Sequence, residues 1–198
     1  MRGEFVKIGG LAAALLLVWL GALLWGGTTS GFDVWLSSVL YLGAGDGSVP
    51  FWRMVTELGG WKVLIGLTAL AFVYLMIRRR ARDAWFLLGV VLGVRALVEV
   101  QKLAFARPRP EVRHLAEVSS YSFPSGHAAN ALATYAALAV LLTFGTWPRV
   151  GVAVLVGAIG VSRILLGVHW PSDVLGGWAL AAFWLLIAFQ FRAKSLRP

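Results

Sequence analysis

Long stretches without a charged residue, separated by short basic segments, are the dominant feature of this sequence. No residue from Ile8 to Phe32 is charged. At about 1.5 Å of rise per residue, a helix of that length can cross the hydrocarbon core of a bilayer, which is about 30 Å thick. Hydrophobic residues make up 59% of the chain and charged residues only 14%, whereas soluble domains have roughly 25% charged residues. We therefore predict an integral membrane protein whose first helix is retained rather than cleaved as a signal peptide.

Six apolar segments predict an all-α fold, a six-transmembrane-helix bundle that forms a single domain over residues 1–198. The spans are expected at about residues 8–27, 58–77, 84–105, 124–144, 150–167 and 171–191. Between the first two, apolar residues recur on one helical face around Trp35 and again around Met54, with a break from Gly43 to Pro50. This spacing predicts two short helices in the membrane interface. Packing against the bundle explains them as well as a role in admitting substrate.

Basic residues determine the expected orientation. The second span ends at the run from Arg78 to Arg82, and Arg192, Lys194 and Arg197 follow the last span. Short arginine-rich segments remain in the cytoplasm, so we predict a multi-pass protein of the cytoplasmic membrane with both termini cytoplasmic. The formal charge of +9 is spread over such segments rather than gathered in one patch, and no nucleic-acid partner is expected. The absence of cysteine excludes disulfides and thiolate catalysis.

The third span carries three ionisable residues, which are costly at membrane depth unless they pair or serve a function. Arg95 and Glu99 are spaced i, i+4, and we predict that they form a structural pair. Lys102 is different, because Pro108 and Pro110 cannot continue the helix and the chain leaves the span just after it. The loop that follows is expected at the outer membrane face.

The sequence from Ser122 to His127, SFPSGH, opens the fourth span, with Pro124 expected at the first helical position. Free N–H groups of a first helical turn bind anions, Gly126 lets a ligand approach the backbone, and Ser125 adds a hydroxyl donor. His127 lies at the mouth of the same turn. By itself this motif is not specific, because serine and glycine often do no more than cap a helix.

A second polar cluster lies between the fifth and sixth spans, in the sequence SRILLGVHWPSD from Ser162 to Asp173. Trp170 precedes Pro171 and is expected to be extended, so His169 lies just outside the sixth helix. Asp173 is expected in the first turns of that helix. Its carboxylate can accept a hydrogen bond from one nitrogen of the His169 imidazole, which leaves the other nitrogen with a free lone pair, as a nucleophilic histidine requires. A His–Asp pair that only caps the helix needs the same spacing, so the pair alone leaves both interpretations open.

The cations expected at the outer face favour catalysis. Lys102, Arg109 and Arg163 join two histidines and a helix N-terminus, and few carboxylates apart from Asp173 lie nearby to neutralise them. Guanidinium groups bind phosphoryl oxygens bidentately and stabilise charge on a transferring phosphoryl group. The pattern therefore predicts a substrate that carries a phosphate.

Three segments together resemble the motifs of the type 2 phosphatidic acid phosphatase (PAP2) family, which shares its site with the vanadium haloperoxidases. They are KLAFARPRP, which begins at Lys102, PSGH, which begins at Pro124, and SRILLGVHWPSD, which begins at Ser162. They follow the family's order at the ends of the expected helices, without a departure at the motif positions. In its small size, the chain also resembles the bacterial phosphatases that act on undecaprenyl diphosphate and on phosphatidylglycerophosphate.

The resemblance implies a role for each motif residue. Five residues are implied to hold the phosphate: Lys102, Arg109, Ser125, Gly126 and Arg163. His169 is implied to attack phosphorus and form a phosphohistidine, with Asp173 orienting it. His127 is implied to protonate the leaving oxygen and then to activate water. No metal or cofactor is expected, because the cations provide the charge stabilisation.

The expected activity is hydrolysis of a lipid phosphate or diphosphate at the outer face of the membrane. Polyprenyl diphosphate, phosphatidylglycerophosphate and phosphatidic acid are the candidate substrates. The alternatives are a phosphotransferase with the same intermediate, a vanadate haloperoxidase, and a non-catalytic protein that binds or transports lipid phosphates. Two histidines argue against the last of these, since binding needs no nucleophile or acid. The sequence does not reveal the oligomeric state.

Three basic residues of the outer loop lie outside the motifs: Arg107, Arg113 and His114. Each is expected to be an exposed loop residue. The two arginines are also available to a second phosphate of a diphosphate substrate.

Overall fold

The computed structural model describes residues 2–25, 30–118, 120–142 and 145–195. These residues form eight α-helices and no strand, which confirms the predicted all-α class. In chain order the helices are α1 (Arg2–Trp25), α2 (Gly31–Leu40), α3 (Val49–Glu57), α4 (Trp61–Ile77), α5 (Ala81–Phe105), α6 (Gly126–Leu141), α7 (Thr146–Leu165) and α8 (Pro171–Ser195).

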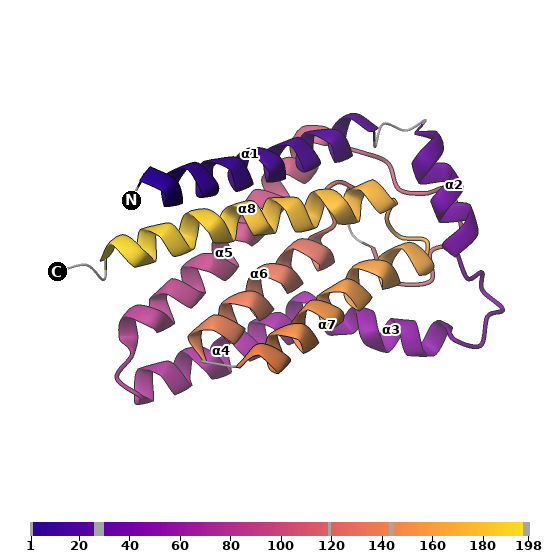
Figure 1. Ribbon diagram of the computed structural model, residues 1–198. Helices are drawn as coiled ribbons and strands as arrows, with labels where there is room; N and C mark the ends of the chain where they lie inside the picture. The colour runs from indigo at the N-terminus through magenta and orange to yellow at the C-terminus, as the bar shows by residue number, and fades with distance from the viewer. Residues whose placement is uncertain (1, 26–29, 119, 143–144, 196–198) are drawn as a thin grey trace.

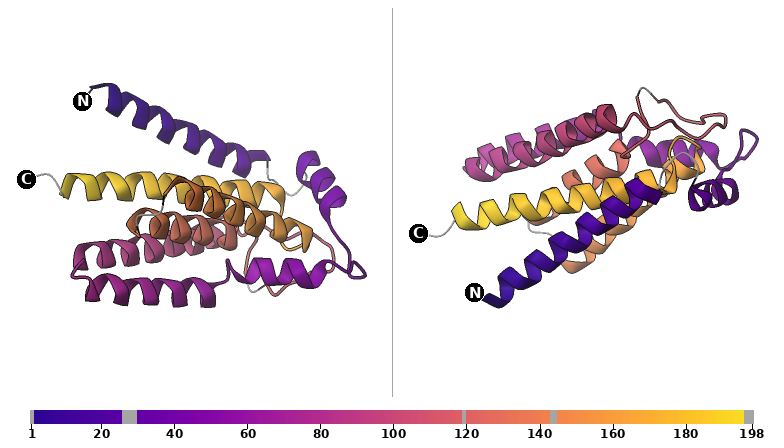
Figure 2. Two further views of the ribbon diagram at one scale, coloured as in Figure 1. Left: turned by 60° about the horizontal axis from the view of Figure 1, so that its bottom comes forward. Right: turned by 90° about the horizontal axis from the view of Figure 1, so that it is seen from above.

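The long helices α1, α4, α5, α6, α7 and α8 run side by side along one direction (Figure 1). The short helices α2 and α3 lie toward one end of this bundle, and the two chain termini lie at the other end, as the further views also show (Figure 2). The loop between α5 and α6 and the turn between α7 and α8 lie at the same end as α2. The two motif-bearing connections therefore meet, although helices separate them in sequence.

Helix α6 lies at the centre of the bundle, in contact with α4, α5, α7 and α8. Its buried positions are mostly alanine: Ala128, Ala129, Ala131, Ala133, Ala137 and Ala139. Small side chains let neighbouring helix backbones approach closely, which is how helices pack without large apolar side chains between them. Larger residues of α5, such as Leu87, Val90 and Val94, fill the remaining space in the core.

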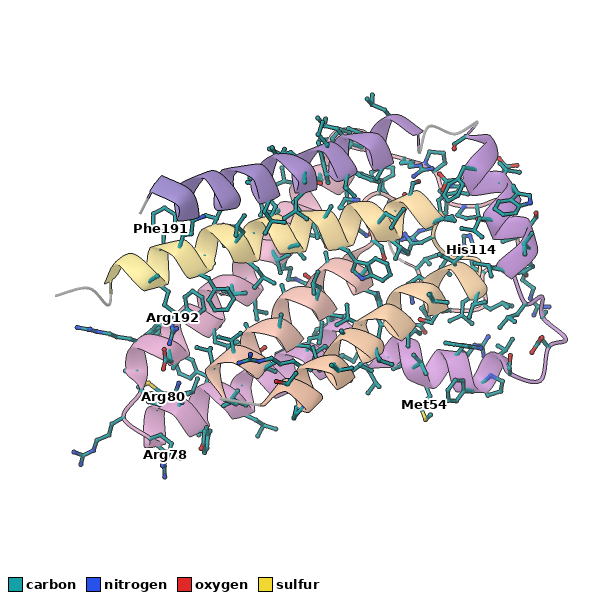
Figure 3. All side chains as sticks on the ribbon, in the orientation of Figure 1. Met54, Arg78, Arg80, His114, Phe191 and Arg192 are labelled. Carbon is teal, nitrogen blue, oxygen red and sulfur yellow. The ribbon has the colours of Figure 1, made fainter. Side chains whose placement is uncertain are left out.

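Charged side chains tie the helices together at the end that carries the termini. Asp83, in the first turn of α5, accepts hydrogen bonds from Arg80 at 2.8 Å and from Arg192 of α8 at 2.7 Å. Arg80 also donates to the carbonyl of Leu141 at the end of α6, at 2.8 Å. Arg78, Arg80 and Arg192 lie at this end, far from His114 at the opposite end (Figure 3). The run from Arg78 to Arg82 and Arg192, which were used to predict the orientation, thus lie at one end of the bundle.

Three stretches of the described residues are long and apolar enough to cross a membrane by length and composition: Val49–Ile77, Pro148–Leu165 and Pro171–Ala193. The first of them joins α3 and α4. The predicted short helices between the first two spans are present as α2 and α3. The last residues of two predicted spans, 26–27 and 143–144, lie outside the described residues.

Some predicted boundaries were wrong by a few residues. Helix α4 begins at Trp61 instead of residue 58, because Gly60 is extended and forms its N-cap. Helix α6 begins at Gly126 instead of Pro124, because Ser125 is extended and its N–H donates to the carbonyl of Asp173 at 2.9 Å. The end of α7 at Leu165 is likewise two residues earlier than expected.

The predicted pair of Arg95 and Glu99 is not formed either. Both residues are exposed on α5, and no ion pair joins them. The i, i+4 spacing places two side chains on neighbouring positions of a helix surface, but it does not by itself bring their charged ends together.

Candidate active site

Backbone hydrogen bonds bring the α5–α6 loop and the α7–α8 turn together. The N–H of Leu115 donates to the carbonyl of Leu166 at 3.0 Å, and the N–H of Ser125 donates to that of Asp173 at 2.9 Å. Gly177 allows the second contact, because a Cβ there would lie only 2.7 Å from the Ser125 carbonyl oxygen. The PSGH segment is therefore seated directly on the first turns of α8.

The α7–α8 turn places His169 between the two helices. Gly167 has a φ of +69°, a left-handed conformation that favours glycine, and it ends α7. The N–H groups of Val168 and His169 then donate to the carbonyl of Arg163, at 3.1 and 3.2 Å. Pro171 begins α8 at the first helical position. His169 is thereby held at the end of α7, one turn before Asp173.

The His169 ring is oriented by a completely buried carboxylate. Its Nδ1 lies 3.3 Å from Oδ2 of Asp173, which is 0% exposed. The same oxygen accepts hydrogen bonds from the N–H of Trp170 at 2.9 Å and from the hydroxyl of Ser122. A proton on Nδ1 then points at the carboxylate, which leaves the lone pair on Nε2. The predicted His–Asp pair is therefore present in the geometry that a nucleophile needs.

Arg109 faces the other side of the ring, with its Nη1 3.3 Å from Nε2 of His169. Its guanidinium also donates to the carbonyls of Ser120 at 2.8 Å and Tyr121 at 3.2 Å, and to that of Val168. Burial, followed by the positive charges of Arg109, Arg163 and Lys102, lowers the pKa of His169 well below its ordinary value of 6.5. The imidazole is therefore neutral near pH 7, and its Nε2 carries a lone pair.

Lys102 and Arg163 are buried in the last turns of α5 and α7, at 6% and 3% exposure. Lys102 donates to the Ser120 hydroxyl at 2.6 Å, and Arg163 donates to the Thr56 hydroxyl of α3 at 2.8 Å. The Nε of Arg163 has no hydrogen-bond partner among the described residues. None of the ion pairs formed by the described residues includes Lys102, Arg109 or Arg163. Buried cations without a carboxylate are unstable on their own and favour binding of an anion.

The start of α6 offers further donors to such an anion. The hydroxyl of Ser125 is buried and has no hydrogen-bond partner among the described residues. A Cβ on Gly126 would lie no closer than 3.6 Å to any neighbour, and the third-nearest atom is Cε of Lys102 at 4.0 Å. The first turn of α6 thus opens toward the buried cations, with free N–H groups that suit an anion.

His127, the second residue of α6, borders a cavity of about 430 Å³. Arg163 lines the same cavity, together with Glu57, Lys62 and Glu117. His127 lies within electrostatic range of Lys102, Arg109, Arg163 and His169. All eight predicted site residues are therefore gathered at one end of the bundle.

Two site residues were missed by the sequence analysis, and one prediction was wrong. Arg107 is not an exposed loop residue: it is 7% exposed and forms ion pairs with Asp173 at 2.6 Å and with Asp33 at 2.7 Å. Asp33 was overlooked, although a single carboxylate next to a long uncharged run is itself a signal. Ser122 belongs to the quoted SFPSGH segment, but no role was assigned to it.

The other two loop residues outside the motifs stand apart from the cluster. Arg113 is exposed as predicted, and its carbonyl accepts a hydrogen bond from the Tyr41 hydroxyl at 2.9 Å. His114 was also predicted to be exposed, but it is partly buried, because its ring packs against the loop with Nε2 3.0 Å from the carbonyl of Pro110. Neither of these side chains has a partner in common with His169 in the described residues.

The site thus combines cations and hydrogen-bond donors that suit an anion with a neutral, carboxylate-oriented imidazole. This combination is suited to nucleophilic attack on a phosphoryl group. Comparisons with known proteins show what the chain is similar to. The sequence model of the PAP2 superfamily matches residues 83–197, which include α5 to α8. The chain is 34% identical over 153 residues to phosphatidylglycerophosphatase B of Bacillus subtilis, covering 72% of this chain and 75% of that protein.

Two further similarities extend over most of the chain. It is 30% identical over 149 residues to undecaprenyl-diphosphatase of Sulfolobus acidocaldarius, covering 71% of this chain and 69% of that protein. Among solved structures, the transmembrane PAP2 type phosphatidylglycerolphosphate phosphatase from Bacillus subtilis superimposes with a TM-score of 0.85 at 28% identity. That superposition covers 94% of this chain and 98% of the other.

Proposed function

Because the chain belongs to the PAP2 superfamily and is a membrane phosphatase of that family, we propose that it hydrolyses a lipid phosphate or diphosphate through a phosphohistidine on His169. The main support for this proposal is a set of three cations around a neutral imidazole: Lys102 and Arg163, which are buried, and Arg109, which is partly buried. None of them forms an ion pair with a carboxylate of the described residues. A phosphoryl group supplies the missing negative charge, and the imidazole supplies the nucleophile.

In the proposed complex, the phosphate oxygens lie among these three cations, the Ser125 hydroxyl and the N–H groups that begin α6. In the structure, Nη1 of Arg109 lies 3.3 Å from Nε2 of His169. Binding therefore transfers guanidinium N–H groups from the imidazole lone pair to the phosphate oxygens, which frees Nε2 to attack. The cations then stabilise the charge that spreads over the equatorial oxygens in the transition state, the task that Mg²⁺ performs in many kinases.

In the first step, Nε2 of His169 forms a bond to phosphorus while the bond from phosphorus to the leaving oxygen breaks. His127 donates a proton to that oxygen, and Asp173 stabilises the positive charge that develops on the ring by accepting from Nδ1–H. In the second step, His127 takes a proton from a water that attacks phosphorus. The P–N bond breaks, and His169 returns to its neutral form with inorganic phosphate as the product.

The cavity of about 430 Å³ beside His127 is the proposed location of the leaving group. A proton donor must be next to the oxygen that it protonates, and His127 lines this cavity together with Arg163. The cavity is also lined by residues of the junction between α3 and α4 and of the α5–α6 loop, and we expect a lipid headgroup to enter it while the chains remain in the membrane. The proposed substrates are phosphatidylglycerophosphate and undecaprenyl diphosphate, after which these two relatives are named. Phosphatidic acid is a third candidate.

The proposed membrane arrangement retains the six predicted spans as one domain, with the site at the outer face and both termini in the cytoplasm. The position of both termini and the Arg78–Arg82 turn at one end of the bundle, with the site at the other, supports it (Figure 1). An even number of spans, such as six, places both termini on the same side of the membrane, whereas an odd number would place them on opposite sides.

Phosphate release by the purified full-length protein tests the proposed function. The substrates are phosphatidylglycerophosphate, undecaprenyl diphosphate and phosphatidic acid in mixed micelles, each with and without EDTA. We expect release from at least one lipid that EDTA does not affect, inhibition by vanadate as a transition-state mimic, and no release by His169→Ala. His114→Ala is the matched control, since it removes an imidazole outside the cluster. Activity in His169→Ala, or loss of activity with EDTA, would contradict the mechanism.

Trapping of the intermediate provides an independent test. Brief incubation with substrate labelled at the cleaved phosphate, followed by denaturation in alkali, should leave label on the wild-type protein and none on His169→Ala. We expect His127→Ala to accumulate more labelled protein than the wild type for a substrate with a good leaving group, because hydrolysis of the intermediate then lacks its general base.

A further inference from the structure

The first turn of α2 carries a carboxylate that is almost completely buried. Asp33 is 1% exposed, although Phe32 and Val34 on either side of it are largely exposed. Helix α2 lies across the end of the bundle, where it contacts α7 and α8 (Figure 1). A buried carboxylate is costly unless opposite charges and hydrogen bonds compensate it, so its partners indicate its role.

Asp33 is fully engaged with residues next to the nucleophile. Its Oδ2 accepts from Nη2 of Arg107 at 2.7 Å and from the Ser172 hydroxyl, and its Oδ1 accepts from the Ser172 N–H at 2.9 Å. Nη1 of Arg107 donates to Oδ1 of Asp173 at 2.6 Å and to the Ser172 hydroxyl at 2.8 Å. The other carboxylate oxygen of Asp173 faces Nδ1 of His169 at 3.3 Å. A continuous series of contacts thus runs from α2 to the nucleophilic imidazole.

This series lies apart from the cations that would bind phosphate. Among the described residues, the only ion pair of Asp33 is with Arg107. Arg107 in turn places its guanidinium over the Trp170 ring, at 5.7 Å from the ring centre, and pairs with Asp33 and Asp173. Asp33 is therefore connected to Asp173 through Arg107 and through Ser172, and not through the cations that would bind phosphate.

We propose that Asp33 is a positioning residue of the phosphatase site: it holds Arg107 against Asp173, and so keeps that carboxylate in place to orient His169. This inference rests on the proposed function, in which His169 is the nucleophile. It makes α2 part of the catalytic apparatus. The outer face of the same helix carries exposed Phe32, Trp35 and Val39, so the element that positions the nucleophile also presents apolar side chains of the kind that bind a membrane interface.

Loss of the Asp33 charge has two expected consequences. Arg107 loses one of its two carboxylate partners, so Asp173 and the imidazole are held less firmly and kcat falls. A negative charge near His169 is also removed, which disfavours the imidazolium and moves the acid limb of kcat to lower pH. The charged or titratable groups around His169 are Lys102 of α5, Arg107 and Arg109 of the loop, His127 of α6, Arg163 of α7 and Asp173 of α8. The phosphate-binding cations remain, so KM changes little.

The test compares Asp33→Asn with Asp46→Asn in the full-length protein. Asp46 lies in the exposed loop after α2, where it accepts from the N–H and hydroxyl of Ser48 at 2.7 and 2.6 Å. For each protein, kcat, KM, the pH profile of kcat and the thermal midpoint are measured. We expect Asp33→Asn to lower kcat by about ten- to a hundredfold, with a small change in KM and an acid limb at lower pH. Asp46→Asn should resemble the wild type, and Asp33→Glu should recover part of kcat.

Two results would overturn this inference. One is a wild-type kcat and acid limb in Asp33→Asn. The other is a loss of activity in Asp33→Asn that is fully explained by a smaller amount of folded protein, while the protein that stays folded keeps the wild-type pH profile. If Asp33→Asn does not fold, Ser172→Ala replaces it, since it removes one hydroxyl between Asp33 and Arg107 and keeps the N–H that binds Asp33. A smaller fall in kcat is expected there, and wild-type kcat would overturn the inference.

A parallel assay of His169→Ala separates the inference from the function on which it rests. If the wild type releases no phosphate, or if His169→Ala retains activity, then the proposed function fails and the role of Asp33 fails with it. If the wild type is active, His169→Ala is inactive and Asp33→Asn behaves like the wild type, then only the positioning role is overturned.

Discussion

Two groups of charged side chains meet at His169, and they differ in whether opposite charges compensate them. In the first group, which we call the paired cluster, Arg107 lies between the carboxylates of Asp33 and Asp173. In the second, the unpaired cations, Lys102, Arg109 and Arg163 have hydroxyl and carbonyl partners but no carboxylate among the described residues. Arg107, Lys102 and Arg163 are all buried and Arg109 is partly buried, so the two groups differ mainly in their partners and not in their depth.

The difference shows how a protein separates holding a nucleophile from binding its substrate. In the paired cluster the charges compensate one another, and removing one of them leaves others buried without a partner. The unpaired cations are incomplete until an anion arrives, so they contribute to binding at a cost to the empty protein. Arg107 and Arg109 illustrate this contrast, because they are two residues apart and each precedes a proline, yet they belong to different groups.

Replacing Arg107 should give the largest effect on folding. Arg107→Met leaves Asp33 and Asp173 buried without their shared cation, which costs about 3–5 kcal/mol. For a chain of this size that corresponds to a fall of about 6–20 °C in the thermal midpoint. Thermal unfolding of the purified protein measures it, with Arg113→Met as the control for loss of an exposed arginine from the same loop. An unchanged midpoint would show that the pairing contributes nothing to stability.

Replacing Arg163 should affect phosphate release strongly and the thermal midpoint little, the opposite of what is expected for Arg107. It is as deeply buried as Arg107. Its guanidinium donates to the Thr56 hydroxyl, however, and forms no ion pair with a carboxylate of the described residues. Arg163→Met should therefore leave the thermal midpoint unchanged or raise it, while phosphate release falls by about 10²–10³-fold because charge stabilisation is lost. A midpoint that falls as far as in Arg107→Met would erase the distinction between the two groups.

The pH dependence of kcat/KM tests how the unpaired cations affect the pKa of the His169 imidazole. The pKa of His169 is lowered well below 6.5 by burial, Arg109, Arg163 and Lys102. The reactive neutral form is therefore present above that lowered pKa, and activity is lost as the pH falls through it. Arg109→Met removes the nearest cation, so the pKa of His169 should rise and the acid limb should move to higher pH. A limb that stays in place or moves down would contradict this electrostatic account.

The same lowered pKa affects stability in a known direction. In the unfolded chain His169 binds a proton below about pH 6.5, whereas in the folded protein it resists protonation. Its contribution to folding is thus fully present above pH 6.5 and declines as the pH falls below that value. Thermal midpoints measured from pH 8 to pH 5 should fall less steeply in His169→Gln than in the wild type.

Gly126→Ala should give the smallest effect. The added Cβ would lie at least 3.6 Å from every neighbouring atom, so the folded protein accommodates it and the thermal midpoint should be unchanged or slightly higher. If phosphate approaches the first turn of α6, the methyl group should raise KM several-fold while kcat changes less. Unaltered kinetics would mean that the anion does not contact this turn.

Much of the site was predictable because its residues lie in short local patterns. The turn at Gly167, the proline at position 171 and the one-turn spacing of His169 and Asp173 specify that pair within a few residues. Lys102 and Arg163 were also recognisable, since each is an ionisable residue at the end of an apolar helix. The PSGH segment was located correctly, although α6 begins two residues later than expected because the Ser125 N–H is bonded to α8.

Arg107 and Asp33 could not be assigned in this way. Their contact joins residues 74 positions apart, and the contact of Asp33 with the Ser172 N–H joins residues 139 positions apart. No local spacing distinguishes Arg107 from the exposed Arg113 in the same loop. Their roles depend on which side chain is enclosed when α2 packs across the ends of α7 and α8.

The sequence by itself determined the helical class, the membrane character and the identity of the groups that can act on a phosphate. These follow from hydropathy, proline and glycine positions and side-chain chemistry, all of which are local properties. Only the tertiary structure decided which cations have carboxylate partners and which do not. That decision depends on burial and on long-range packing, because a charge is stabilised or left incomplete by its neighbours in space, wherever they lie in the chain.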